Sequence, residues 1–322
     1  MLASPQNCEK RAVRLLGAFT RRFRAGAPAL NLSWSNWGFG REPLARSVAR
    51  LAGAGVRWIE LHGNHYTKDQ GYDPATVRKL LADHGVRAAG ICGMFSREND
   101  LSSTSAVARQ QALDYIRREL DFGHALGVSY MLVVPGAVGR PAAYDAFEFE
   151  RSVDTLRQAG DDFVRAGIRA AIEPIRSDEV SFCHSLADAA RYIAAVDHPG
   201  IRHINGDLYH LLHHEDDPAV AILQYGRQMV NLHMADTNRG ALGTGVYNLD
   251  AVIAALYLVG YNRADRFCTC EPLGPGGDVY RAMHGVTPER ALDTLVRRTA
   301  TYWRARERAL RQAAAAATRE RS

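Results

Sequence analysis

Short apolar runs and helical segments alternate eight times along this chain of 322 residues. Each run has the length of a strand, and the segment after it has the apolar spacing of a helix. Five of the helical segments end near a glycine, among them Gly127 and Gly260, as helices often do. Eight strand–helix pairs are the number that closes a parallel barrel. We therefore expect an α/β protein that forms a single (β/α)8 barrel of the TIM-barrel type.

This alternation places the elements and the limits of the domain. The expected strands are residues 30–34, 58–62, 87–92, 130–134, 169–175, 202–207, 229–233 and 267–271. The expected helices are residues 43–52, 74–83, 105–126, 147–166, 186–196, 219–225, 249–258 and 288–305. The barrel then occupies residues 29–307, between an Arg-rich extension over residues 1–28 and a flexible tail over residues 308–322. For the extension we favour a disordered or docking segment over a transit peptide.

Four residues of the types that bind divalent metals lie at the ends of four successive strand candidates. They are Glu173, Asp207, His233 and Glu271. All strands of a parallel barrel end on the same face, so these four side chains should converge in space. Carboxylate oxygens and one imidazole, without a thiolate, suit Mn²⁺ or Mg²⁺ and also Co²⁺. The sequence therefore predicts a divalent metal site.

An alternative interpretation needs no metal. The three carboxylates could form buried ion pairs with arginines of the barrel, such as Arg176 or Arg202. Burying three negative charges close together costs a large amount of free energy when no cation accompanies them. We therefore prefer the metal site.

The same residues resemble the metal-site motifs of a known family, the ketose 3-epimerases of the xylose-isomerase-like barrels. In order and spacing, the matching residues are Glu173, an Asp-x-x-His formed by Asp207 and His210, His233, and Glu271 followed by Pro-Leu. The resemblance covers roughly residues 31–304. It implies that Glu173 and Glu271 bind the metal and also exchange a proton with the carbon beside a keto group. It further implies that His210 and Arg239 hold substrate oxygens.

Two regions differ from the epimerase pattern. Ketose epimerases follow the first metal ligand with an Asn-Arg-Tyr/Phe-Glu stretch that grips the sugar, whereas this chain has Pro-Ile-Arg-Ser-Asp-Glu at residues 174–179. Aromatic and histidine side chains also gather in the loops of the catalytic face, namely Trp34, Trp37, Phe39, Phe95, His62, His65 and Tyr66. An aromatic rim suits a substrate with a flat ring, although surface imidazoles and ordinary packing at the barrel mouth would give the same pattern.

These features resemble the α subunit of bacterial C-glycoside deglycosidases, an offshoot of the same superfamily. The resemblance lies in residues 35–40, 63–66 and 271–277. It implies a metal-dependent lyase that cleaves the carbon–carbon bond of 3-keto C-glycosides of aromatic aglycones. It also implies a small β subunit as partner.

The lyase interpretation assigns roles to the residues around the metal. We expect His65 to take part in catalysis together with Glu173, Glu271 and His210. The residues expected to bind the substrate are Arg239, Trp34, Trp37, Phe95 and His62. We expect Trp34, Trp37, Phe39 and Tyr66 to form an exposed edge that contacts the β subunit. The alternative function is a ketose 3-epimerase or sugar isomerase that acts alone on a free ketose.

Composition and charge argue against two other classes of protein. The arginines behind the net charge of +5 are scattered over the helices instead of forming a stripe, which does not favour a nucleic-acid-binding protein. An abasic-site endonuclease, a remote alternative with a related barrel, would need many more His and Asp/Glu ligands for three zinc ions. No apolar run is long enough to span a bilayer, and five cysteines without paired spacing suit the cytoplasm. We therefore expect a cytoplasmic bacterial enzyme of carbohydrate metabolism.

Overall fold

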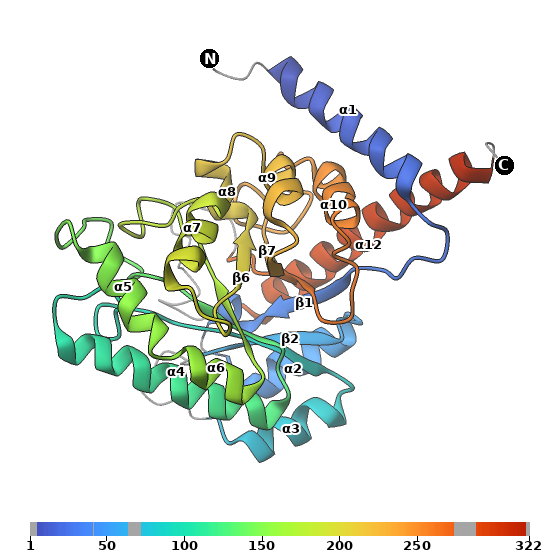
Figure 1. Ribbon diagram of the computed structural model, residues 1–322. Helices are drawn as coiled ribbons and strands as arrows, with labels where there is room; N and C mark the ends of the chain where they lie inside the picture. Colours follow the sequence, from blue (N-terminus) through green and yellow to red (C-terminus); the bar gives the residue numbers. More distant parts are fainter. Residues whose placement is uncertain (1–4, 41, 64–71, 274–287, 320–322) are drawn as a thin grey trace.

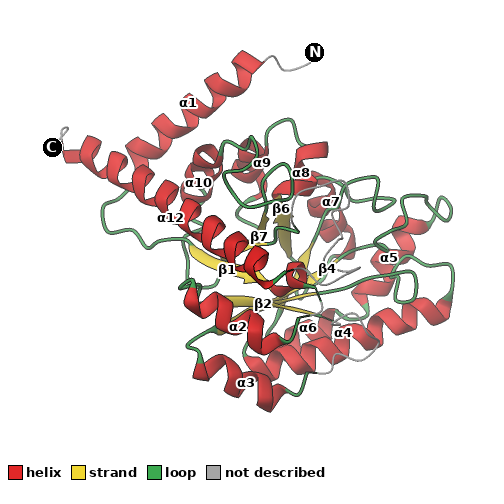
Figure 2. Ribbon diagram, turned by 180° about the vertical axis from the view of Figure 1, so that it is seen from behind, coloured by secondary structure: helices red, strands yellow, loops and turns green. Residues whose placement is uncertain are grey.

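Eight parallel strands form a closed barrel in sequence order, and β8 pairs with β1 to close it. The structure is a computed structural model that describes residues 5–40, 42–63, 72–273 and 288–319. The strands are β1 (Asn31–Ser35), β2 (Trp58–His62), β3 (Arg87–Cys92), β4 (Tyr130–Val133), β5 (Arg169–Ile172), β6 (His203–Asp207), β7 (Met229–Met234) and β8 (Phe267–Cys270). Helices cover the barrel from outside (Figure 1, Figure 2). The predicted single TIM barrel is confirmed.

Helices connect successive strands, as expected for this class of barrel. They are α1 (Pro5–Arg22), the 3-10 helix η1 (Asn36–Phe39), α2 (Leu44–Gly53), α3 (Pro74–Asp83), α4 (Ala106–Leu126), α5 (Glu148–Arg157), α6 (Gly160–Ala166), α7 (Leu186–Val196), α8 (Leu208–His214), α9 (Pro218–Tyr225), α10 (Leu249–Leu258) and α12 (Glu289–Arg319). The segment expected as one helix over residues 147–166 is two, because tighter turns at Gln158 and Ala159 interrupt it. Helix α8 was not expected from the sequence.

The barrel interior contains an apolar layer and a polar layer. The apolar layer comes from six strands and consists of Trp58, Ala89, Tyr130, Ala171, Val230 and Phe267. Only the inside of the barrel can bring residues of so many strands into contact. Further along the strands, toward their C-terminal ends, buried polar side chains take over, namely Glu60, Asn205, Asn231 and Thr269. This polar layer lies directly beneath the face on which parallel barrels carry their active sites.

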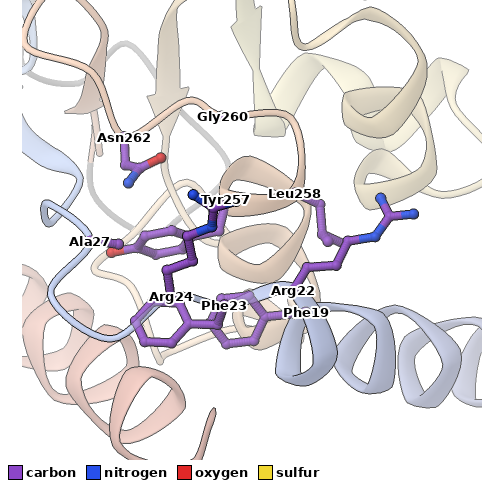
Figure 3. Close-up of a pocket in the computed structure, with 9 residues that line it drawn as sticks. All are labelled: Phe19, Arg22, Phe23, Arg24, Ala27, Tyr257, Leu258, Gly260 and Asn262. Carbon is purple, nitrogen blue, oxygen red and sulfur yellow. The ribbon is translucent and has the colours of Figure 1, made fainter. Parts of the chain in front are cut away.

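Helix α1, which lies in the expected extension, packs against α10 and α12. Its residues Leu15 and Phe19 are buried, as is Phe23 directly after it, and the ring centroid of Phe19 lies 5.5 Å from that of Tyr257 on α10. A cavity of about 280 Å³ remains between α1 and α10, and Figure 3 shows these aromatic residues lining it together with Asn262. The segment before the barrel is therefore a docked helix in the part that the structure describes.

Helix α12 extends well past the barrel wall, beside α1 (Figure 1, Figure 2). We expected the flexible tail from residue 308 to be a solvated helix extension that frays, and the chain is helical to Arg319. Ala314 is buried, Leu310 packs against the core, and Arg311 donates a hydrogen bond to the carbonyl oxygen of Ala27. Contacts with the N-terminal segment thus hold this end in helical form. Within the described ranges, no helix is both long and apolar enough to cross a membrane.

The packing of α1 yields a test of its contribution to stability. We expect Phe19→Ala to lower the free energy of unfolding by about 3 kcal/mol, because it removes a buried aromatic ring and leaves a cavity. Val13→Ala on the same helix should change it by less than about 0.5 kcal/mol, because Val13 is 70% exposed. Urea unfolding of both variants measures the two values. Equal stability of the two variants would show that α1 is not docked in solution.

A buried carboxyl on α4 should make the stability depend on pH. Burial raises the pKa of Glu119 to about 8 from its ordinary value of 4.5. Between these two values the folded chain binds a proton that the unfolded chain releases, so the stabilising contribution is complete below pH 4.5 and declines as pH rises toward 8. The decline has an upper limit of roughly 1.4 kcal/mol for each pH unit.

Glu119→Gln should remove this part of the pH dependence and make the protein more stable than wild type at pH 8. Thermal unfolding of both proteins between pH 5 and pH 8.5 measures the difference between them. Parallel curves would mean that Glu119 is ionised in the folded protein across the whole range.

Candidate functional site

The four expected metal ligands meet at the C-terminal end of the barrel. Asp207 ends β6 and lies beside His233 of β7 in the sheet register, while Glu173 and Glu271 directly follow β5 and β8. All four side chains are buried. The fold therefore brings together residues that are up to 98 positions apart in the sequence, from Glu173 to Glu271.

The distances between these side chains suit a bound cation. The Nδ1 atom of His233 lies 3.3 Å from Glu173 Oε1 and 3.4 Å from Glu271 Oε2. One ligand atom each from Glu173, Asp207 and His233 lie within 4.8 Å of one another. A single ion among these atoms could reach an imidazole nitrogen and several carboxylate oxygens, the donors that Mn²⁺ and Mg²⁺ accept.

Electrostatics also favours a cation at this place. Burial raises the pKa of Glu271 to about 8 and also raises the pKa of Glu173, and the neighbouring carboxylates add to both shifts. Burial alone would lower the pKa of His233, but Glu271 and Glu60 raise it well above its usual value. A divalent cation among these carboxylates would offset the mutual repulsion that raises the pKa of Glu173 and Glu271.

The interpretation without a metal requires that barrel arginines form ion pairs with the expected metal ligands. The arginines suggested from the sequence do not form these pairs. Arg176 pairs with Glu179 and Asp178. Within the described residues, no ion pair joins Arg176 or Arg202 to one of the four expected ligands. Arg239 does approach them, with Nη2 at 3.5 Å from Glu271 and 3.9 Å from Asp207. One arginine and one histidine leave the carboxylates with an excess of negative charge.

A small cavity opens onto the expected ligands. Its volume is about 50 Å³. The polar residues that line it are Cys92, Glu173, Glu179, His210, Arg239 and Glu271. The apolar residues that line it are Trp37, Met94, Phe95, Leu132, Val134, Val138 and Ile175. Of the residues expected to bind substrate, Arg239, Trp37 and Phe95 therefore do lie at this cavity.

His210 and Arg239 are held in place by neighbours of the site. Burial lowers the pKa of His210 to about 4, so its imidazole is neutral near pH 7. Its Nε2 lies 3.4 Å from Asp207 Oδ2. The guanidinium of Arg239 stacks 4.4 Å from the ring centroid of Tyr209. A neutral imidazole and a fixed cation at one cavity are suited to bind hydroxyl or carbonyl oxygens.

Trp34 does not lie at the cavity, contrary to the sequence prediction. Neighbouring residues of a strand face opposite sides. Ser33 and Ser35 lie beside the inward-facing Thr269 and Glu60 in the sheet register, so Trp34 between them faces outward, where it stacks on Phe39 with ring centroids 5.7 Å apart. Trp34, Trp37 and Phe39 are all buried, so the prediction that they form an exposed edge for a partner is wrong.

The two histidines predicted near the end of β2 are His62 and His65. His62 is buried at the end of β2, where its backbone N–H donates to Asn36 Oδ1 at 2.7 Å, but it does not line the cavity. His65 and Tyr66 lie outside the described residues, as do residues 274–277 of the segment that resembles the deglycosidases.

Glu60 is part of the site but was not predicted. It is fully buried in β2, and both of its carboxylate oxygens lie close to His233 Nε2, at 2.9 and 3.0 Å. A charged residue between Ile59 and Leu61, inside an apolar strand, was the available signal. Its inward direction could not be inferred, because β2 has a register shift between Ile59 and Glu60.

The chain belongs to the family of xylose isomerase-like TIM barrels, because the sequence profile of that family matches residues 48–299. Among its relatives is an L-ribulose 3-epimerase of Methylomonas sp. (strain DH-1), 26% identical over 76% of this chain and 83% of that protein. Another is the 3-dehydro-D-guloside 4-epimerase of Escherichia coli (strain K12), 29% identical over 59% of this chain and 72% of that protein. The relatives support chemistry of the sugar epimerase and isomerase type.

Solved structures agree in fold. An L-ribulose 3-epimerase superposes with a TM-score of 0.77 at 18% identity, covering 88% of this chain and 96% of the other. A D-allulose 3-epimerase from Methylomonas sp., in complex with D-allulose, gives a TM-score of 0.74 at 22% identity, covering 87% and 99%. At these identities the likeness concerns the barrel itself.

The geometry separates the expected metal ligands from a residue that would touch substrate. Asp207→Asn should weaken Mn²⁺ binding at least about 10-fold, because it removes a charged oxygen from the ligand group. His210→Ala should leave Mn²⁺ binding within about twofold of wild type and lower kcat by about 10²–10³-fold, as loss of a donor to a reacting oxygen does. Calorimetric titration and steady-state kinetics measure the two effects. Equal loss of metal in both variants would make His210 a ligand.

Proposed function

We propose that this protein is a divalent-metal-dependent epimerase that inverts the hydroxyl-bearing carbon beside the carbonyl of a keto sugar. The observation that carries the proposal is the position of two buried glutamates, Glu173 and Glu271, at one cavity. Their oxygens lie 3.3 and 3.4 Å from the same imidazole nitrogen of His233. Two carboxylates that converge from β5 and β8 can act on one carbon from different sides.

The metal would be held by Glu173, Asp207, His233 and Glu271, with Mn²⁺ or Mg²⁺ preferred for the oxygen-rich donors. When bound, such an ion polarises the carbonyl and stabilises the negative charge that develops on its oxygen. The fit rests on the donor types and on their separation of at most 4.8 Å within the group Glu173, Asp207 and His233.

Proton transfer would fall to the two glutamates. One carboxylate removes the proton from the carbon beside the carbonyl, and the other returns a proton to its opposite face. Burial raises the pKa of both groups, which allows each carboxyl to retain a proton between the two steps. His210 and Arg239 would hold the sugar oxygens, and the surrounding apolar side chains would exclude water from the cavity.

The substrate class is a keto sugar, either free or carried as a 3-keto glycoside. The relatives include enzymes named for both kinds, an L-ribulose 3-epimerase and a 3-dehydro-D-guloside 4-epimerase. In both reactions the inverted carbon is adjacent to a carbonyl. Glu179 at the cavity, held by Arg176, offers a further carboxylate for a sugar hydroxyl.

A second candidate is the carbon–carbon bond-cleaving deglycosylation of 3-keto C-glycosides. A carboxylate would take the proton from C2, the bond from C1 to the aryl carbon would break, and that carbon would take a proton, leaving a sugar enone. The apolar wall formed by Trp37, Phe95 and Ile175 favours a substrate with an aromatic group. A small β subunit belongs to this candidate, and it would have to contact residues other than the buried Trp34, Trp37 and Phe39.

Parallel assays distinguish the two candidates. The Mn²⁺-loaded protein is incubated in D₂O with L-ribulose, D-allulose, a methyl 3-keto-glucoside and a 3-keto C-glycoside of a flavone. We expect an epimeric product with deuterium at the inverted carbon for at least one of the first three. Metal removal by chelation, Glu173→Gln and Glu271→Gln should each lower the rate at least about 10²-fold. Glu150→Gln, an exposed glutamate on α5, is the matched control.

Two outcomes would contradict the epimerase. Release of the flavone without epimer formation would favour the lyase candidate. Absence of deuterium exchange with L-ribulose, D-allulose and the methyl 3-keto-glucoside would be the second.

A further inference from the structure

A hydrogen-bonded polar layer inside the barrel joins five strands and contacts the expected metal ligands. Its members are Glu60, Tyr130, Asn205, Asn231 and Thr269. Each of these side chains is fully buried. Burying so many polar groups is tolerated only where each is hydrogen-bonded, so the layer has little freedom to rearrange. Its position directly beneath His233 raises the question of what it does for that residue.

The two ring nitrogens of His233 have different surroundings. Nε2 faces Glu60, whose two oxygens lie at 2.9 and 3.0 Å. Nδ1 faces the expected metal ligands Glu173 and Glu271, and Asn205 Nδ2 lies 3.3 Å from it. The carboxylate of Glu60 can only accept a hydrogen bond, so Nε2–H is the donor toward it. The NH₂ group of Asn205 can only donate, so its contact with Nδ1 places a lone pair on that nitrogen, on the side of the expected metal ligands.

Glu60 is itself held in one orientation. The hydroxyl of Tyr130 donates to Glu60 Oε2 at 2.8 Å, and Asn231 Nδ2 donates to the same oxygen at 3.1 Å. With His233, three donors therefore converge on this carboxylate and fix the direction of its two oxygens.

The layer also reaches a second expected ligand. Asn231 donates to Asn205 Oδ1 at 2.7 Å, and Asn205 donates to Glu173 Oε1 at 2.7 Å. Thr269 donates to Asn231 Oδ1 at 2.6 Å. The carboxylate of Glu60 is thus connected, through two amides, to the carboxylate of Glu173.

We propose that Glu60 is a positioning residue that fixes His233 with Nδ1 toward the metal and Nε2–H toward the barrel floor. The inference rests on the proposed function, because it concerns how the same site binds its ion. Metal-binding histidines are commonly oriented by a carboxylate on their second nitrogen, and loss of such a carboxylate typically weakens the metal 10–100-fold.

Direct metal binding by Glu60 is the competing explanation. Ligand atoms of Glu60, Cys92 and Glu271 lie within 4.8 Å of one another. Both oxygens of Glu60 are already directed at His233, however, and burial raises the pKa of the Cys92 thiol well above its usual value, which opposes the thiolate that binds metals. The two explanations differ in stoichiometry, since a second site would bind a second ion.

Calorimetric titration of the metal-free full-length chain with Mn²⁺ tests the proposal. Wild type should bind one ion. Glu60→Gln should weaken binding about 10-fold, because the amide oxygen can still accept from Nε2–H while its NH₂ group opposes Tyr130 or Asn231. Glu60→Ala should weaken it about 100-fold. Glu119→Gln replaces another fully buried glutamate, on α4, and should bind Mn²⁺ like wild type.

A second readout separates positioning from a purely structural role. In the Mg²⁺-loaded wild type, the Nε2–H proton of His233 should give a solvent-protected NMR resonance that is absent in His233→Asn. In Glu60→Gln this resonance should change its chemical shift or disappear because the proton exchanges with solvent. A loss of thermal stability in Glu60→Gln with unchanged Mn²⁺ affinity and unchanged resonance would overturn the proposal.

The remaining outcomes are equally decisive. Two ions in wild type and one in Glu60→Gln would make Glu60 a ligand and overturn the positioning role. Equal weakening by Glu119→Gln would show that removing any buried carboxylate weakens binding, and would overturn the positioning role of Glu60. Failure of wild type to bind Mn²⁺ would overturn the proposed function itself, whereas normal wild-type binding with unaffected Glu60 variants would overturn only this inference.

Discussion

The mutual repulsion of buried carboxylates is the constraint around which the catalytic face is organised. Glu60, Glu173, Asp207 and Glu271 lie within a few ångströms of His233, and all are withdrawn from water. Charges in such a place require either protons or cations. Arg239, His233 and the hydrogen-bonded amides offset part of the charge. A divalent ion would offset the rest, which links the stability of this region to its occupancy.

The lining of the cavity combines two kinds of side chain. Glu173, Arg239 and Glu271 are charged, whereas Phe95, Val134 and Ile175 are apolar. The carbonyl and hydroxyls of a sugar are polar, whereas a glycoside can carry an apolar group. The apolar part of the lining is therefore the part that would discriminate among keto sugars.

Periodicity and the order of ligands were enough to predict the barrel, the strand ends and the group Glu173, Asp207, His233 and Glu271. Glu60 was missed because its partner lies 173 positions away, and the sequence contains no motif that joins them. Trp34 was misplaced because a strand residue one position away from the site points to the opposite face. The direction of a strand side chain depends on the exact register between neighbouring strands. In β2 this register shifts at an irregularity between Ile59 and Glu60.

The first and last strands meet where the barrel closes. β1 pairs with β8, and Glu307 of α12 accepts hydrogen bonds from Leu30 N at 2.8 Å and from Tyr257 at 2.6 Å. During synthesis the first strand must therefore wait for nearly the whole chain to leave the ribosome before it gains its second neighbour. The apolar face of α1 is exposed for the same interval. While the chain is being synthesised, the barrel should therefore be open and lack its last strand. Chaperones could then bind the exposed apolar face of the N-terminal helix.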